Sequence, residues 1–334
     1  MKIANSTIIQ YKAKCEWLQS RFNIAKELDE KLSLAQWVLN ITSNIIPRTW
    51  SIYRAALMWG VQNKIVDFGI SNKNEIIEIL YEKNNINCKK RKVSASTSRL
   101  RYKHLPQEIY KKLLSHMDMS HSKYDHFLKL MFDATVMTGL RPSEWKTLSI
   151  KKIPNKVNAY LLKVKNSKVT QDRSFGTHRH LLVISNTSDI KTIKQVNIVF
   201  KSIFETKGND GFKKFYDSLV HRLKYLNNRI GQNGKKKRIT IYSARHQFKI
   251  NMEVQKGCDR HVLAALMGHG SIATAAQNYG RKNKAWNTKI TVKPHSSDVQ
   301  KVIKLNQNKQ HNLEFDPIKM KKYKDQKVIT NEQP

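Results

Sequence analysis

Apolar residues recur at helical spacing over the first part of the chain. In the segment PRTWSIYRAALMWGVQ they fall on one stripe, made of Trp50, Tyr53, Leu57, Met58 and Val61. Pro47 stands where such a helix would begin, because proline is tolerated in a first helical turn. The helical pattern covers about residues 31–65, and NEIIEILYEKNN forms another amphipathic stretch. We expect residues 1–88 to form a small, all-helical domain.

The pattern breaks between residues 89 and 105. The run KKRKVSASTSRLRYK contains seven basic residues, no acidic ones, and several serines and threonines. An isolated run of this kind is usually a solvated basic loop or a localisation-like patch. Between two helical domains, an interdomain linker laid along a nucleic-acid backbone is favoured. The residues expected to contact that backbone are Lys89, Lys90, Arg91, Lys92, Arg99 and Arg101.

A second domain is expected over residues 106–284. Helical periodicity returns in PQEIYKKLLSHM and YDHFLKLMFDATVMTGL. The short runs AYLLKVK and HLLVI then flank a polar loop and predict a β-hairpin. Helices resume in two stretches, VNIVFKSIFETK and FKKFYDSLVHRLKYLNNRI, and in further segments toward Tyr279. Residues 285–334 are charged and polar, and we expect a C-terminal tail that is exchanged between protomers or disordered. The predicted fold class is mainly α with a small antiparallel β-sheet.

The charge of the chain points to a polyanionic partner. Lys and Arg total 62 against 25 Asp and Glu, a formal net charge of +37. Self-repulsion of this size destabilises a folded protein, and a phosphate backbone would neutralise it on binding. A ribosomal-type protein or a generally basic proteome would give the same excess, so composition favours nucleic acid without choosing between DNA and RNA.

Cysteine usage and hydropathy limit the remaining classes. Cys15, Cys88 and Cys258 are scattered, and none belongs to a zinc-ligand spacing, so we interpret them as reduced thiols of a cytoplasmic protein. No signal-peptide-like segment and no apolar run of membrane-spanning length is present, and we expect no membrane association.

The segment TGLRPSE places Arg141 between a helix that ends at Gly139 and one that opens at Pro142. A guanidinium suits a phosphodiester because it is always charged and offers paired planar donors to two oxygens. Glu144 is a supporting candidate that could brace Arg141 or a neighbouring helix. Taken alone, the segment could equally be a helix cap with a surface ion pair.

Two later segments carry further candidates. IYSARHQF contains Arg245 and the supporting candidate His246, with Tyr242 one helical turn before the arginine. LAALMGHGSIATAAQNYGRK contains His269 and, ten residues later, Tyr279. We expect these side chains to meet in one pocket.

Four segments, TGLRPSE, YSARHQF, LMGHGS and the final tyrosine, resemble in order the boxes of the tyrosine recombinase (phage integrase) family. The resemblance covers roughly residues 106–281. It implies a helical core-binding (SAM-like) DNA-binding domain followed by an α+β catalytic domain. It also implies that Arg141 and Arg245 are the catalytic arginines, His269 the catalytic histidine and Tyr279 the nucleophile.

Two positions fit the family pattern less closely. The family's hairpin lysine aligns best with Lys165, and Lys163 and Lys168 remain alternatives. Tyr242 stands where the family usually has a histidine, and a phenol can donate a hydrogen bond but carries no positive charge near neutral pH. The interval from His269 to Tyr279 is one residue longer than the commonest pattern.

By resemblance the chain is a site-specific recombinase or integrase of a mobile element. Tyr279 would attack the phosphorus, and Lys165 would protonate the leaving 5′ oxygen, giving a 3′-phosphotyrosyl intermediate without metal, ATP or other cofactor. The implied partners are double-stranded DNA recombination sites, further copies of the chain as a dimer per site and a tetramer in synapsis, and an accessory DNA-bending protein.

Three other functions remain open. A type IB topoisomerase would use the same nucleophile but reseal the same strand. A DNA-binding protein that kept the fold and lost catalysis is suggested only by Tyr242. A helix-turn-helix regulator could place a recognition helix within residues 260–279, but the rest of the second domain would be unexplained.

Overall fold

The computed structural model describes residues 5–82, 100–120, 122–167, 169, 174–234, 236–273, 284–287 and 290–314. The chain divides into two compact units, residues 1–96 and residues 97–334. Within the described parts, no helix combines the length and the apolar character needed to cross a membrane.

The first unit is helical, as predicted. Its helices are α1 (Asn5–Leu28), α2 (Leu34–Asn44), α3 (Pro47–Gln62) and α4 (Lys73–Glu82). Helix α2 begins at a capping box in which the Ser33 hydroxyl accepts from the Gln36 amide and the Gln36 side chain accepts from the Ser33 amide. The aromatic rings of Phe22, Trp37 and Phe68 pack edge to face or tilted in its core.

Helix α1 was not predicted as a separate element, because apolar residues on its exposed side obscure the stripe that faces the core. Cys15, Leu18 and Phe22 are buried against the rest of the unit, whereas Ile9 and Leu28 are exposed. The helix is held mainly by its contacts with α3. Tertiary packing therefore decides this element more than sequence periodicity does.

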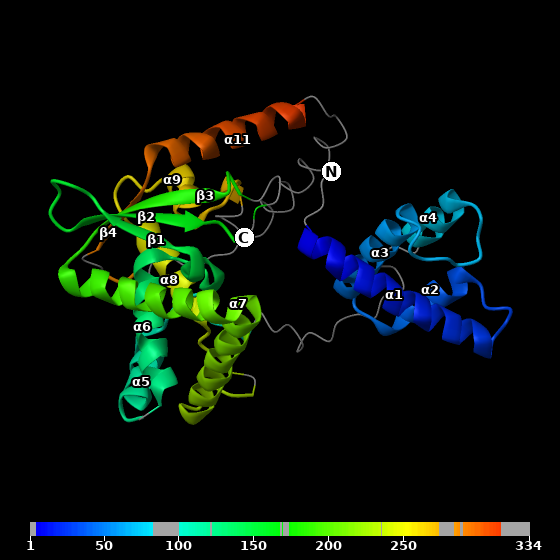
Figure 1. Cartoon of the computed structure of the whole chain (residues 1–334), viewed down its shortest axis with the longest axis horizontal. Helices are drawn as coiled ribbons and strands as arrows, with labels where there is room; N and C mark the ends of the chain where they lie inside the picture. Colours follow the sequence, from blue (N-terminus) through cyan, green and yellow to red (C-terminus); the bar gives the residue numbers. More distant parts are fainter. Residues whose placement is uncertain are drawn as a thin grey trace, which may run out of the picture. The chain divides into compact units, whose positions relative to one another are not determined.

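The second unit joins helices to a small sheet (Figure 1). Its elements are α5 (Gln107–Asp118), α6 (Lys123–Thr138), the 3-10 helix η3 (Pro142–Thr147), β1 (Ser149–Lys152), β2 (Ala159–Lys165), β3 (His178–Ile184), α7 (Thr187–Arg229), α8 (Ile241–Glu253), α9 (Arg260–Met267), β4 (Thr291–Pro294) and α11 (Ser296–Glu314). The strands are antiparallel in the order β1-β2-β3-β4. The predicted hairpin is confirmed as β2 and β3.

Helix α7 contains a break that the sequence had suggested. Two separate helical stretches were predicted here, and Gly208 interrupts the element with φ 63° and ψ −160°. Only glycine adopts this conformation without steric cost. The two predicted helices are therefore present and follow each other through this kink.

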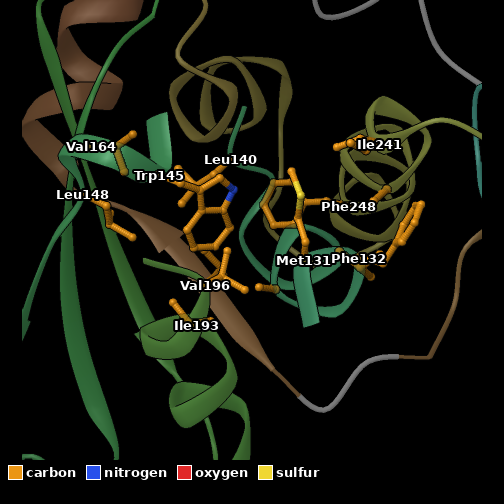
Figure 2. Packing of buried hydrophobic residues seen from close by; sticks show 14 of the residues in the cluster. Met131, Phe132, Leu140, Trp145, Leu148, Val164, Ile193, Val196, Ile241 and Phe248 are labelled. Carbon is orange, nitrogen blue, oxygen red and sulfur yellow. The ribbon is translucent and has the colours of Figure 1, made fainter. Parts of the chain in front are cut away.

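The core of the second unit is centred on Trp145 of η3, whose side chain is fully buried. Figure 2 shows its indole with Leu148 and Val164 from the sheet side and Ile193 and Val196 of α7 around it. Burial of a tryptophan of this size contributes several kcal/mol, on the order of 25 cal/mol for each Å² removed from water. The packing fixes η3, and with it the end of the arginine-bearing TGLRPSE segment.

The boundaries of the second unit are wider than predicted. Residues 291–294 pair with β3, and α11 packs against α9, so at least residues 290–314 belong to this unit and are not a separate tail. Strand β4 has four residues, too few for a period of two to be recognised. At the other end, Leu105 is buried, and Leu100 and Tyr102 hydrogen-bond to the backbone of Arg238, so the last residues of the predicted linker also pack here.

Gly139 is required where α6 ends, because its φ is 65° and an added Cβ would collide with the buried Phe248 ring. We expect Gly139→Ala to lower the free energy of unfolding by roughly 2–4 kcal/mol, the sum of left-handed strain and overpacking. Urea denaturation measures this. The control is Gly231→Ala, where φ is 73° but no atom lies within 4 Å of the new Cβ. Equal losses in the two variants would show that the Phe248 contact does not matter.

Candidate active site

The carboxylate of Glu144 lies at the centre of the site, and its side chain has no solvent exposure. Glu144 sits in the first turn of η3, a position that Trp145 secures by its burial. The guanidinium groups of Arg141 and Arg179 form ion pairs with it at 2.8 Å, and that of Arg245 lies 3.9 Å away. Three guanidinium groups around one carboxylate give the described cluster an excess of positive charge, which suits an anion such as a phosphodiester.

Arg141 caps η3 and is bound to Glu144 in two ways. Its backbone amide donates to Oε2 and its Nη1 donates to Oε1, both at 2.8 Å. Because donors on both the main chain and the side chain are engaged, the arginine has little rotational freedom. Its side chain is 9% exposed, so Arg141 keeps some contact with solvent, unlike Arg179.

Arg245, on α8, connects the ends of two other helices. Its Nη1 donates to the carbonyl of Gly139 at the end of α6, and its Nη2 donates to the carbonyl of Met267 at the end of α9, at 2.7 Å. A helix end carries partial negative charge on its free carbonyls, which a cation stabilises. Arg245 therefore holds the segments that carry Arg141 and His269 at fixed positions.

His269 follows the left-handed Gly268 that ends α9, and its amide donates to the Ala264 carbonyl at 2.8 Å. Its Nδ1 is buried and makes no hydrogen bond with any described residue. Burial lowers the pKa of His269 most, and Arg245, Arg141 and Arg179 lower it further, to about 2. The imidazole is therefore neutral near neutral pH and able to donate one hydrogen bond.

The ionisation of Glu144 depends on its cations. Burial alone would raise the pKa of this carboxyl, but the charges of Arg179, Arg245 and Arg141, together with the hydrogen bonds from Arg179, outweigh it. The pKa is held well below its usual range, and Glu144 stays ionised throughout the physiological pH range.

The hairpin loop reaches the same cluster through Asn166, not through Lys165. The amide of Asn166 accepts from Arg179 at 2.6 Å and donates to the Gly176 carbonyl at 2.8 Å. Lys165 is the last residue of β2 and is directly opposite His178 on β3, whereas Val164 is opposite Arg179. Because paired residues share a face of the sheet, the side chain of Lys165 leaves the strand on the face opposite to that of Arg179. Lys163 shares the face of Lys165.

Tyr242 lies at the surface of α8. Its side chain is 44% exposed, and it lines a cleft of about 430 Å³ with Tyr216, Arg101 and Arg238. Burial, with a smaller effect of Tyr242, raises the pKa of Tyr216 to about 12. Among the predicted DNA contacts, Arg101 therefore lines the same cleft as Tyr242.

His246 is next to Arg245 on α8 and is partly buried. Burial lowers its pKa to about 4, with smaller effects from Arg245, Lys103 and Lys249. It is thus a second neutral imidazole close to the predicted site. The remaining predicted site residues lie outside the described residues: Lys89, Lys90, Arg91, Lys92, Arg99, Lys168 and Tyr279.

Sequence reasoning missed Arg179, although a signal was present. In HRHLLVI the residues Arg179, Leu181 and Val183 share one face of the strand, and the structure buries all three. An arginine in register with core residues indicates a buried charge that needs a partner. Asn166 gave no comparable signal, because a polar residue in a hairpin loop is ordinary. Among the described residues, no group of three or more His, Cys, Asp or Glu side chains is placed to hold a metal ion.

We expect Glu144→Gln to lower the free energy of unfolding by about 3–5 kcal/mol, because three buried or nearly buried cations lose their counter-ion. Urea denaturation of the second unit's transition measures the change. The control is Asp118→Asn, which removes the carboxylate of an exposed pair with Lys129. That pair should contribute less than about 1 kcal/mol. A small loss in Glu144→Gln would contradict the central place of this carboxylate.

The histidines predict a dependence of stability on pH. The unfolded chain binds protons at its histidines below about pH 6.5, whereas folded His269 and His246 do not until far lower pH. The free energy of unfolding is therefore highest above about pH 6.5 as far as these histidines are concerned. As the pH falls below about 6.5, it decreases by up to about 1.4 kcal/mol per pH unit for each histidine. Urea midpoints between pH 7.5 and 5 measure it. The slope should be shallower in His269→Asn, and an unchanged slope would contradict burial of the neutral imidazole.

Comparisons with known proteins identify a family for this chain. The sequence model of the phage integrase family matches residues 103–285. Two crystal structures of the XerH site-specific recombinase are similar, a post-cleavage complex with a palindromic difH substrate and a pre-cleavage complex with difH. The first has a TM-score of 0.43 and 18% identity over 74% of this chain and 68% of that one. The second has a TM-score of 0.40 and 19% identity over 77% and 72%.

A search of curated protein sequences gives no match to this chain. The family match covers more than half of the chain and includes Arg141, Arg245, His269 and Tyr279. The chain therefore belongs to the phage integrase family, the tyrosine recombinases.

Proposed function

We propose that this protein is a site-specific DNA recombinase that cleaves and rejoins strands through a 3′-phosphotyrosyl intermediate on Tyr279. The observation that carries the proposal is the convergence of Arg141, Arg245 and His269 around Glu144, from three segments far apart in the sequence. A buried carboxylate surrounded by more guanidinium groups than it can neutralise forms a site that favours binding of an anion. Family membership makes a DNA phosphodiester the anion of choice.

The chemistry follows from these groups. Attack of the Tyr279 hydroxyl oxygen on phosphorus, with its proton passing to a nearby base, builds up negative charge on the nonbridging oxygens. Fixed guanidinium donors stabilise this charge without reorganisation. Because burial keeps His269 neutral, it would add a hydrogen bond to the same oxygens. The P–O bond to the 5′ oxygen breaks as the tyrosyl ester forms, so attack by a 5′-OH of another strand can reverse the step without ATP.

The leaving 5′ oxygen needs a proton, and a lysine of the hairpin is the proposed donor. The side chains of Lys165 and Lys163 both leave β2 on the face opposite to that of Arg179, while Asn166 hydrogen-bonds to Arg179 in the cluster. Lys165 would have to reach around the end of β2, and Lys168 is the alternative in the following loop. We retain Lys165 as the first candidate and Tyr242 as a second hydrogen-bond donor to the phosphate.

The proposed partner is a double-stranded recombination site of a mobile element. The excess of 62 basic over 25 acidic residues supports strong backbone binding that weakens steeply with salt. The basic residues from Lys89 to Arg101 would lie along the backbone between the two units. Pairing of two sites would need a dimer on each and a tetramer in synapsis, with an accessory DNA-bending protein as a further partner.

Tyr279→Phe tests the mechanism. A duplex selected for binding from random sequence is nicked near the bound centre, so that cleavage releases a short strand and traps the adduct. We expect wild type to form a denaturant-resistant protein–DNA adduct in the presence of EDTA and without ATP, and Tyr279→Phe to form none, because phenylalanine has no nucleophile.

The matched control is Tyr225→Phe, an exposed tyrosine on α7 of the same unit, which should form as much adduct as wild type. Absence of an adduct on a tightly bound duplex would identify a DNA-binding protein without catalysis. Resealing of only the original strand, with no transfer to a second duplex, would identify a topoisomerase. Adduct formation by Tyr279→Phe would place the nucleophile elsewhere.

A further inference from the structure

Arg179 is a charged residue on the core face of a strand. It shares that face of β3 with Leu181 and Val183, and its side chain has no solvent exposure. A phosphate in solution or in DNA therefore has no access to its guanidinium in this structure. Any role in the reaction must act through other residues.

The Arg179 guanidinium makes a two-point contact with Glu144. Its Nη1 donates to Oε1 at 3.1 Å and its Nη2 donates to Oε2 at 2.8 Å. This planar fork fixes the orientation of the carboxylate plane, which a single ammonium group cannot do. The orientation matters because each Glu144 oxygen also accepts a hydrogen bond from Arg141.

The same guanidinium contacts two further segments. Nη1 also donates to the Asn166 side chain at 2.6 Å, next to Lys165 in the hairpin. A Cβ added to Gly268 would lie 2.9 Å from this Nη1 and 2.6 Å from Asn166 Oδ1, so the turn before His269 rests directly against the pair. One side chain thus joins the η3, hairpin and α9 segments.

Stability alone is a weak reason for such an arrangement. Two charges without solvent are costly to desolvate, and well-packed apolar residues in place of a buried ion pair are often neutral or stabilising. The geometric consequence is more specific, since three predicted catalytic side chains, Arg141, Lys165 and His269, are each attached to a segment that Arg179 contacts.

We propose that Arg179 is a positioning residue of the recombinase site, whose guanidinium holds Glu144, the hairpin loop and the Gly268–His269 turn in one arrangement. The proposal rests on the proposed function, because it assigns Arg179 a part in that strand-cleavage reaction. It gives the buried arginine no contact with the DNA.

The test compares Arg179→Met and Arg179→Lys with Arg222→Met. The control arginine makes a similar fork to a fully buried carboxylate, with Nε and Nη2 donating to Asp125 at 2.7 and 2.6 Å, but that pair joins α7 to α6 away from the cluster. The nicked duplex described above is used, with cleavage rate measured at saturating DNA, together with the dissociation constant and the thermal midpoint.

We expect Arg179→Met to bind the duplex within about threefold of wild type, because Arg179 contacts no DNA, and to cleave it about 100-fold more slowly, the usual effect of a misplacement near 1 Å. Arg179→Lys keeps the charge and loses the fork, so its cleavage should still be slower by about tenfold. Arg222→Met should lose thermal stability without slowing cleavage.

Cleavage should also acquire a new pH dependence in Arg179→Met. With this cation removed, the pKa of Glu144 rises, and the cleavage rate should fall as the pH is lowered from 7 to 5, where wild type is unaffected by this group. A purely structural role for Arg179 would lower the thermal midpoint and leave the pH profile of the folded, bound protein unchanged.

Three results would overturn the proposal: wild-type cleavage by Arg179→Met, wild-type cleavage by Arg179→Lys, or equal slowing in Arg222→Met. A parallel titration with inorganic phosphate, followed through the His269 ring in NMR spectra, does not depend on cleavage. We expect weaker phosphate binding in both Arg179 variants and none of this loss in Arg222→Met. If wild type forms no adduct, the proposed function fails, and this titration alone decides the role of Arg179.

Discussion

A carboxylate removed from water keeps its charge only if cations replace the water, and Glu144 does so with three guanidinium groups. The arginines depend on Glu144 in turn, since Arg141, Arg179 and Arg245 would repel one another without its negative charge. Each arginine belongs to a different element, so the electrostatic balance also fixes how the elements meet. Arg141 precedes η3, Arg179 is on β3 and Arg245 is on α8. The positions of the hairpin loop and of the Gly268–His269 turn depend on their contacts with this cluster.

The ends of two helices also position residues of the site. Helices α6 and α9 both end in left-handed glycines, Gly139 and Gly268, and Arg245 binds the carbonyls of Gly139 and Met267 at these ends. The residues that follow, Arg141 and His269, are thereby aimed at one place. The burial that makes this rigid also keeps the His269 imidazole neutral, so its hydrogen-bonding role is fixed by packing as much as by chemistry.

Much of this local structure could be predicted from the order and spacing of residues in the sequence. Gly139 and Pro142 bracketed Arg141 correctly as a junction between helices, and the two short runs around the polar loop predicted the hairpin. Helix α1 and strand β4 escaped detection, since the apolar stripe of the helix is obscured by exposed apolar residues and the strand has only four residues. Both depend on long-range contacts that no local pattern records.

The sequence by itself determined the family, most of the helical segments, and Arg141, Glu144, Arg245 and His269 as members of the candidate site, because these depend on residue type and order along the chain. Tertiary structure decided which groups share a space. It buried Arg179 against Glu144, turned Asn166 toward the cluster and started Lys165 from the other face of the sheet. Strand register and the desolvation of charge produce these outcomes, and both arise only when distant segments pack together.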